Sequence, residues 1–307
     1  MRTRIYQLLF IILCGVILPY MVLRLALPVK NQSIPEVAPA EKKTGINVLM
    51  SDKRIVEMDI EDYVTCVVLA EMPASFEYEA LKAQSVLART YALKRIGTAK
   101  HDRSSICTDA GCCQGYCDPS EYSGSEDNLS KVRSAVKETE SYVLTYQGTL
   151  VEATYFSCSG GCTEDAIAVW GSDVPYLKSK PSPGEEGSAH FASTKIMSQQ
   201  ECLRELGLSA DSLNVSGATY TRGGGVQEIM LSGVSFNGVT VRQLLGLPST
   251  AFQIRILGDS VIITSKGYGH RVGMSQYGAN AMAKDGADYR QILAYYFEGT
   301  ILDDKLP

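Results

Sequence analysis

Glu71 is the residue whose type and position best suit acid–base chemistry in this chain. It ends a run of apolar residues that recur at helical spacing over residues 60–68, and Pro73 follows two positions later. The pattern predicts a largely buried helix, and the proline should end it near Glu71 because the residue before a proline favours extended geometry. A carboxyl group among apolar neighbours at the negative end of a helix dipole has a raised pKa, which suits a general acid near neutral pH. The alternative is a solvated glutamate at a helix end, since perturbed carboxylates are a minority of such acids.

A second cluster of reactive residues indicates a structural metal. His101, Cys107, Cys112 and Cys113 lie in a polar, loop-like segment, in which Cys107 stands six positions after His101 and Cys113 six after Cys107. One imidazole and three thiolates satisfy tetrahedral zinc and leave no open coordination position, so we expect structural rather than hydrolytic zinc. Disulfide bonds are the alternative, because further cysteines are available to pair: Cys66, Cys117, Cys158, Cys162 and Cys202.

A third polar group stands near the C-terminus, where glycines bracket His270 and the triplet Ser275, Gln276 and Tyr277. This pattern predicts a tight loop that opens onto a helix. Ser275 is a suitable cap for that helix, and the polar and aromatic set equally suits hydrogen bonding and stacking with a sugar. We do not expect a Ser–His nucleophile, because no acid is evidently placed to orient His270.

The composition narrows the class of protein that carries these residues. The chain has 307 residues, enough for a large core or two lobes. Its net charge of −5 and its pI near 5.4 argue against nucleic-acid binding, which usually needs a basic face.

The N-terminus predicts a membrane anchor. Residues 5–23 are free of charge and mostly apolar, and Arg2 and Arg4 precede them. A cleaved signal peptide is the alternative, but no small-x-small cleavage site follows the apolar run. We therefore expect a single-pass transmembrane helix within residues 1–28, a linker at 29–44, and an extracytoplasmic domain at 45–307.

The remaining pattern predicts an α+β fold with mixed helices and antiparallel strands. Strands and helices follow one another without a βαβ rhythm, and the region 188–257 has the character of a smaller second lobe beside one main catalytic domain. We expect strands at 46–50, 142–146, 150–156, 226–231, 240–244 and 261–264, and helices at 60–70, 77–96, 275–284 and 289–296.

Two blocks of sequence resemble a known family. Residues 71–91 read EMPASFEYEALKAQSVLARTY, and residues 267–280 read GYGHRVGMSQYGAN. In this order they resemble the stage II sporulation protein D family, and the resemblance runs from about Ile46 to Thr300. The family comprises peptidoglycan lytic transglycosylases with a glutamate as catalytic acid and base, and Glu71 matches that position.

The resemblance implies roles for further residues. It favours a site-facing position for Arg89, and glycan contacts for Tyr155, which precedes the turn at Gly160 and Gly161, and for the triplet at 275–277. Zinc-binding members of the family carry a His-Cys pair where this chain has Cys112 and Cys113, so the likeness at the metal site is partial. Two residues carry no such signal: Trp170, the only tryptophan, is expected in the core, and His190 in a solvated loop.

The function that the resemblance implies is cleavage of the bond between N-acetylmuramic acid (MurNAc) and N-acetylglucosamine (GlcNAc) in peptide-stripped glycan strands. The products would carry 1,6-anhydro-MurNAc ends, because the substrate supplies its own nucleophile. The implied setting is the mother-cell side of the septal or engulfing membrane, with a stage II sporulation protein P-type amidase and a membrane scaffold of the engulfment complex as partners. The alternative is an amidase-enhancer module, which binds glycan and activates a hydrolase without chemistry of its own.

Overall fold

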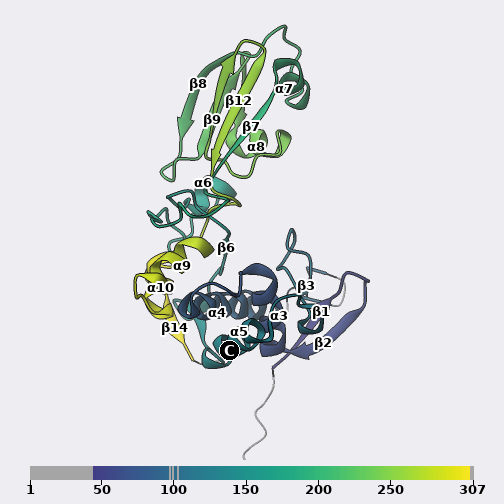
Figure 1. The fold of residues 1–307 in the computed structure, drawn as a ribbon, viewed down its shortest axis with the longest axis vertical. Coiled ribbons are helices and arrows are strands. Elements are labelled where there is room, and N and C mark those ends of the chain that lie inside the picture. The colour runs from purple at the N-terminus through teal and green to yellow at the C-terminus, as the bar shows by residue number, and fades with distance from the viewer. Residues whose placement is uncertain (1–43, 97, 99, 102–103, 305–307) are drawn as a thin grey trace, which may run out of the picture. The chain divides into compact units, whose positions relative to one another are not determined.

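The computed structural model describes residues 44–96, 98, 100–101 and 104–304 (Figure 1). The predicted transmembrane helix within residues 1–28 lies outside this part, as does nearly all of the linker at 29–44. None of the helices in the described part is both long and apolar enough to cross a membrane. The fold of the described residues is α+β, as expected, with eight α-helices and several small, mostly antiparallel sheets.

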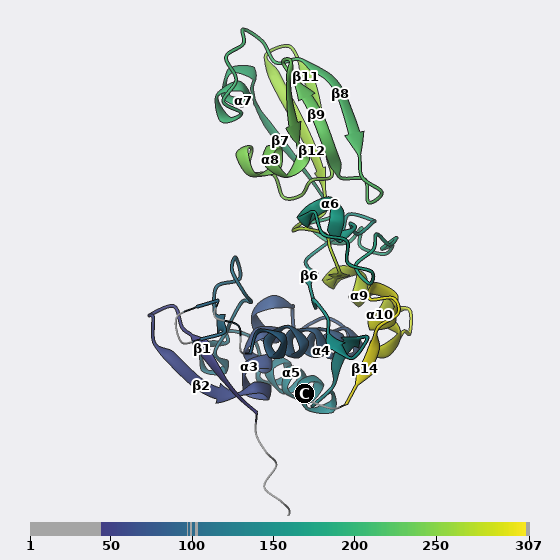
Figure 2. The same cartoon turned by 180° about the vertical axis from the view of Figure 1, so that it is seen from behind.

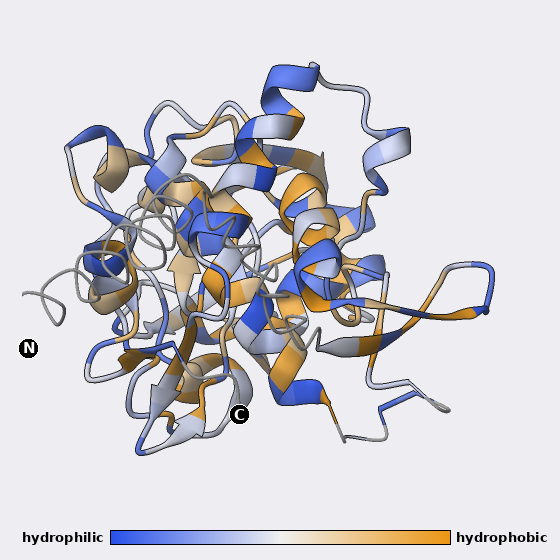
Figure 3. Cartoon of the chain, turned by 90° about the horizontal axis from the view of Figure 1, so that it is seen from below, coloured by the Kyte–Doolittle hydropathy of each residue, from blue (hydrophilic) through white to orange (hydrophobic). Residues whose placement is uncertain are grey.

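Most helices begin at a side-chain cap that the sequence supplies. Asp59, Ser125 and Ser275 each accept a hydrogen bond from a backbone N–H in the first turn of the helix that follows, and Asp288 forms a complete capping box with Gln291. Apolar and polar segments alternate along the helices in Figure 3, as expected for helices with one buried face. The helices are α3 (Ile60–Glu71), α4 (Tyr78–Arg95), α5 (Glu126–Glu138), α6 (Ala166–Trp170), α7 (Gln199–Glu205), α8 (Gly238–Leu244), α9 (Gln276–Lys284) and α10 (Tyr289–Tyr296).

The strands form five small sheets, with the orders β2-β1-β3, β14-β4-β5, β13-β6, β11-β12-β7 and β10-β9-β8. Only the pairs β1–β3 and β13–β6 among them are parallel. The strands are β1 (Gly45–Leu49), β2 (Ile55–Asp59), β3 (Ile106–Cys107), β4 (Val143–Tyr146), β5 (Thr149–Leu150), β6 (Tyr155–Phe156), β7 (Ala192–Ser198), β8 (Val215–Tyr220), β9 (Val226–Leu231), β10 (Val234–Asn237), β11 (Phe252–Leu257), β12 (Ser260–Lys266), β13 (Met274–Ser275) and β14 (Ile301–Asp303).

The larger hydrophobic core surrounds α4. This helix contacts α3, α5, α9, α10 and β4, and it is buried on most sides because small residues such as Ala83, Ala88 and Ala92 let its neighbours approach. Two-residue strands β6 and β13 join the segment after β5 to the start of α9. The core therefore fixes the positions of two helix ends, the C-terminal end of α3 and the N-terminal end of α9.

A second hydrophobic core lies among α7, α8 and the strands β7, β9, β11 and β12, which Figures 1 and 2 show gathered together. Its buried residues run from Met197 to Ile263. The chain enters and leaves this region through neighbouring antiparallel strands, in which Ala192 pairs with Lys266. The division of the chain into a main domain and a lobe at 188–257 stays a prediction.

Two predicted strands differ from the structure. Residues 240–244 were expected as a strand, but they belong to helix α8, whose cap Asn237 accepts a hydrogen bond from the N–H of Thr240 at 2.7 Å. A helix is more stable than a strand here because it buries both Val241 and, one turn later, Leu245. The single strand expected at 150–156 is interrupted. Its first residue ends β5, its last two form β6, and residues 151–154 between them belong to no strand.

Candidate active site

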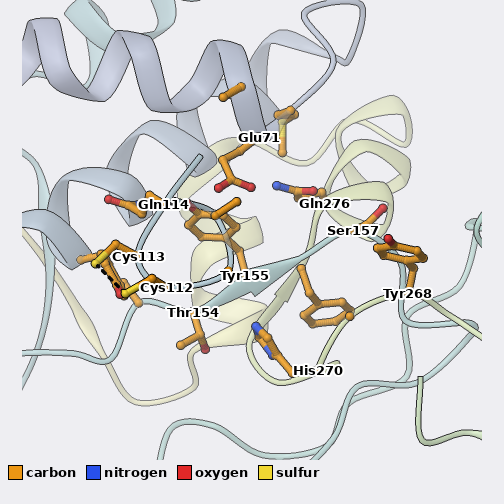
Figure 4. Close-up of a pocket in the computed structure, with 18 of the residues that line it drawn as sticks. Glu71, Cys112, Cys113, Gln114, Thr154, Tyr155, Ser157, Tyr268, His270 and Gln276 are labelled. Carbon is orange, nitrogen blue, oxygen red and sulfur yellow. Dashed lines mark hydrogen bonds between the residues drawn. The ribbon is translucent and has the colours of Figure 1, made fainter. Parts of the chain in front are cut away.

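A cavity of about 1120 Å³ opens beside the C-terminal end of α3 (Figure 4). Its walls come from that helix end, the cysteine-containing loop at 110–114, the segment 152–157 that includes β6, the loop at 268–270 and the start of α9. A volume of this size accommodates a ligand larger than a single sugar ring. Of the residues expected to bind substrate, Glu71, Tyr155, Gln276 and Tyr277 line this cavity.

Glu71 lies at the last position of α3 and is half-buried. Its Oε1 accepts a hydrogen bond from the backbone N–H of Gly115 at 2.5 Å. Burial raises the pKa of Glu71, and this outweighs the N–H of Gly115, which lowers it. The predicted direction is confirmed, and its cause is removal of the carboxylate from water. The helix ends here because Met72 is extended, as expected for a residue before proline.

Gly115 is closely fitted to this acid. A Cβ atom built on Gly115 would lie 3.0 Å from Oε1 of Glu71 and 3.3 Å from the Cβ of Ala70. The adjacent Gln114 ties the loop to two tyrosines: Tyr63 donates to its Oε1 at 3.2 Å, and its Nε2 donates to the hydroxyl of Tyr155 at 2.9 Å. The loop thus holds a hydrogen-bond donor against the acid at a fixed place.

The cysteine loop also gathers the predicted metal ligands. One ligand atom from each of His101, Cys107, Cys112 and Cys113 lies within 4.8 Å of the other three. The Nε2 of His101 is 3.3 Å from Sγ of Cys113 and 3.8 Å from Sγ of Cys112, and the two sulfurs are 4.0 Å apart. Tetrahedral zinc, with Zn–S bonds of about 2.3 Å and Zn–N bonds of about 2.0 Å, separates its ligand atoms by roughly 3.5 to 3.8 Å. The cluster is therefore able to bind a metal such as zinc.

The other described cysteines are free thiols, and no disulfide joins any two of the cysteines in this part of the chain. Cys158 donates to Oε2 of Glu185 at 3.1 Å, and burial raises its pKa to about 12. Cys162 instead pairs with the hydroxyl of Ser179 at 3.3 Å. These contacts give both residues a packing role away from the cavity.

Arg89 is not brought to the cavity. Its side chain is fully buried, and it forms a two-pronged ion pair with Glu61 through distances of 2.7 and 2.5 Å. It also donates to the carbonyl oxygens of Val136 and Tyr142, so it joins α3, α4 and the end of α5. These partners place Arg89 in the framework that carries α3, and we leave it out of the substrate-binding set.

The triplet at the start of α9 divides by role. Ser275 is fully buried and caps α9 by accepting a hydrogen bond from the N–H of Gly278 at 3.2 Å, so the capping alternative describes it. Gln276 and Tyr277 line the cavity, and the ring of Tyr277 packs edge-on against Phe76 at 4.9 Å between centroids.

The sequence-based reasoning missed several residues that line the cavity. Trp170 was expected in the core, but 45% of its surface is exposed, and it lines the cavity together with His190 and Tyr268. The glycines at 267 and 269 were a usable signal for Tyr268. His270, which the sequence pattern had singled out, lines the cavity as well. Burial lowers the pKa of His270 to about 4, so this ring is neutral near pH 7.

A charged pair completes the cavity wall near the cysteine loop, with Arg95 at the end of α4 and Glu152 in the segment between β5 and β6. Glu152 and Arg95 both line the cavity and form an ion pair at 3.1 Å, and Lys94 holds the other oxygen of Glu152 at 3.2 Å. Lys100 also lines the cavity and donates to the carbonyl oxygen of Cys112 at 2.5 Å. Two cations that line the cavity, Arg95 and Lys100, stand against the one carboxylate of Glu152, so these side chains make this wall positive.

Comparison with known proteins places the chain in a family. The model of the SpoIID family, described as stage II sporulation protein, matches residues 51–146. The chain is 36% identical over 264 residues to stage II sporulation protein D of Bacillus subtilis (strain 168), covering 83% of this chain and 77% of that relative. The same-named protein of Bacillus amyloliquefaciens is 35% identical over 279 residues, covering 87% and 81%.

A further relative has a different name. The amidase enhancer of Bacillus subtilis (strain 168) is 32% identical over 291 residues, which cover 76% of this chain and 39% of that protein. The two relatives named for stage II sporulation match this chain at higher identity and over most of their own length. The chain belongs to the stage II sporulation protein D family.

Proposed function

We propose that this protein is a lytic transglycosylase that cleaves the MurNAc–GlcNAc bond of peptidoglycan during sporulation. The observation that carries the proposal is Glu71, a half-buried acid with a raised pKa that faces a cavity of about 1120 Å³. Two relatives named stage II sporulation protein D support the setting. We propose that a single transmembrane helix anchors the protein in the cell membrane and that the described domain lies outside the cytoplasm.

In the proposed reaction, protonated Glu71 gives its proton to the oxygen that joins the two sugars. The glycosidic bond breaks, and GlcNAc leaves with that proton on its O4. The resulting carboxylate takes the proton of the muramoyl C6 hydroxyl, whose oxygen closes on C1 to form the 1,6-anhydro ring. The N–H of Gly115 stabilises this carboxylate between the two steps, since it donates to Oε1. Glu71 is then protonated again, and no water is consumed.

Glu152 is the other carboxylate that lines the cavity, so ordinary hydrolysis by two acids needs to be considered. Each of its oxygens already lies within ion-pair distance of a cation, Lys94 or Arg95, which leaves it poorly placed to attack a sugar or activate water. Its contacts favour a binding role. Replacement of Glu152 by glutamine should therefore retain cleavage and the anhydro products, whereas water-added products from the unmodified protein, lost in this variant, would support hydrolysis by two acids.

The positive wall supports glycan stripped of peptide as the substrate. Removal of the peptide leaves a free carboxylate on each muramoyl lactyl group, and Arg95 lies where one is able to approach. The proposed preference is tested with glycan whose carboxylates have been converted to methylamides. Replacement of Arg95 by glutamine should reduce cleavage of the free-acid glycan and leave cleavage of the amide unchanged, and equal losses on both substrates would contradict this assignment.

The metal cluster has a structural part in the proposal. His101, Cys107, Cys112 and Cys113 would hold zinc in a closed tetrahedral site, which would stiffen the loop that presents Gly115 to Glu71. Glycan strands, a stage II sporulation protein P-type amidase and a membrane scaffold of the engulfment complex are the proposed partners.

The second candidate function is that of an amidase enhancer, favoured by the relative of that name. In that case the cavity would bind glycan and Glu71 would contact it without proton transfer. Mass spectrometry of peptide-free glycan incubated with the purified protein separates the two candidates. We expect anhydro-MurNAc ends, which the Glu71→Gln variant should not produce; binding without cleavage by the unmodified protein would favour the enhancer.

A further inference from the structure

Three exposed rings lie in the part of the cavity away from the cysteine loop. Trp170 is 45% exposed and Tyr268 is 49% exposed, yet both line the cavity, as does the exposed ring of His190. Figure 4 shows Tyr268 and His270 on the opposite side of Tyr155 from Cys112 and Cys113. The aromatic and the charged walls are thus separate parts of one cavity.

Backbone contacts hold two of these rings in place. His190 stands just before β7 and Tyr268 just after β12, and their rings are 4.6 Å apart between centroids. Those two strands pair with each other, and the N–H of Tyr268 also donates to the carbonyl oxygen of Cys158 at 2.7 Å. The pair therefore rests on a hydrogen-bonded framework rather than on a free loop.

Trp170 is supported from another element. It is the last residue of α6, which ends at Gly171 in a left-handed conformation with φ of 74°. Its ring packs at 5.4 Å from the neutral ring of His270, which in turn packs edge-on against Phe156 at 5.6 Å. The indole is thereby in contact with protein through His270, and it remains partly exposed where it lines the cavity.

Water-exposed aromatic rings inside a cavity suit a partner with flat apolar faces. A pyranose ring presents such a face through its C–H groups, while its hydroxyl and acetamido groups at the edge remain available for hydrogen bonds. We infer that Trp170 and the His190–Tyr268 pair form a saccharide-stacking subsite that holds an N-acetylated sugar ring of the glycan strand. This inference rests on the proposed function, since it extends the same cavity along the strand.

The single tryptophan makes the subsite measurable. Trp170 is the only tryptophan in the chain, so all indole fluorescence reports from this wall. The probe is a peptide-free glycan fragment of four sugars, added to the full-length Glu71→Gln variant so that the ligand is not consumed. Saturation should protect Trp170 from acrylamide quenching. Calorimetric binding without any change in Trp170 emission or quenching would overturn the subsite.

Variants give a second readout. Tyr268→Ala should weaken binding of the fragment about three- to tenfold, the size expected for loss of one stacked ring. Tyr220→Ala is the matched control, because Tyr220 is 53% exposed on β8 and does not line the cavity. Equal affinities of the two variants for the fragment would contradict the inference, whether both are unchanged or both are reduced.

Failure of the inference is distinguishable from failure of the proposed function. Cleavage by the unmodified protein with an unprotected Trp170 would remove the subsite and leave the enzyme. Protection of Trp170 without cleavage would retain the subsite and remove the enzyme. Protection by an amidase partner but not by glycan would assign these rings to protein contact and overturn the inference.

Discussion

Glu71 and Glu185 are two buried or half-buried acids with opposite surroundings. Glu185 is almost fully buried, and its Oε2 accepts hydrogen bonds from the N–H and hydroxyl of Ser159, the N–H of Gly160 and the thiol of Cys158. The hydroxyl of Ser182 donates to its Oε1 at 2.5 Å. Among the residues that the structure describes, Glu71 has a single backbone donor, and it faces a cavity. The number of donors thus separates an acid that organises a loop from one that faces the cavity.

This difference has a physical basis. Each donor that points at a carboxylate stabilises its charged form and fixes its orientation. An acid held by several donors, such as Glu185, therefore fixes the loop that supplies them. With only one donor, burial dominates at Glu71 and its pKa rises, which general acid catalysis requires.

The largest expected effect contrasts the two acids in catalysis. Glu71→Gln should reduce glycan cleavage by about 10²- to 10⁴-fold, the usual contribution of a general acid. Glu185→Gln should leave cleavage per folded molecule within a few-fold of the original. Release of anhydro-MurNAc ends by equal amounts of folded protein, quantified by circular dichroism, is the measurement. Similar losses of cleavage for both variants would show that the number of hydrogen-bond donors does not separate the roles of Glu71 and Glu185.

Removal of metal should have the next largest effect, because the one donor to Glu71 comes from the cysteine loop. After chelation, or in Cys112→Ser, we expect about a 10- to 100-fold loss of cleavage, as is typical when the support of a site is lost. Bound zinc is measured by mass spectrometry of the metal. Cys202→Ala is the control, because that buried cysteine lies in the second core. Full activity in zinc-free protein would show that the loop holds its shape alone.

Stability should show the reverse contrast. Glu185→Gln places an amide N–H₂ among groups that donate, and we expect a loss of about 1–3 kcal/mol in the free energy of unfolding. Urea unfolding followed by circular dichroism measures this change. Glu185→Asp is a useful companion, since it keeps the charge while shortening the reach. A neutral effect of the glutamine variant would mean that these hydrogen bonds do not stabilise the loop.

The smallest effect concerns Glu71 and pH. Its pKa is higher in the folded than in the unfolded protein, so the folded state binds more protons above pH 4.5, and stability falls as pH rises through the folded pKa. Glu71→Gln should remove this fall. The variant should therefore gain stability relative to the unmodified protein at pH 7 but not at pH 4. A gain that is the same at both pH values would indicate a cause other than proton binding.

The local pattern predicted the acid and its helix well. The apolar spacing and Pro73 placed the end of α3 correctly, because both act within a few residues along the chain. The cluster of His101, Cys107, Cys112 and Cys113 was predicted for the same reason, since three of its members share one short loop.

Long-range partners explain what the sequence did not reveal. Arg89 was expected to face the site, but it forms an ion pair with Glu61 on the neighbouring helix α3, a contact that the local sequence does not reveal. Trp170, His190 and Tyr268 come from three separate segments, and no local pattern signals that they line the same wall. The strand expected at 240–244 had the right composition, but the cap at Asn237 and burial of Val241 favour a helix.

The neighbouring entry and exit strands of the second core bear on the order of folding. Parallel pairing of Tyr155 with Met274 requires closure of a long loop, whose entropic cost grows with its length and slows folding. Formation of the second core first brings Ala192 next to Lys266 and removes most of that loop. The less costly route is therefore one in which the sheets of the second core assemble early and the cavity-forming strands β6 and β13 meet last.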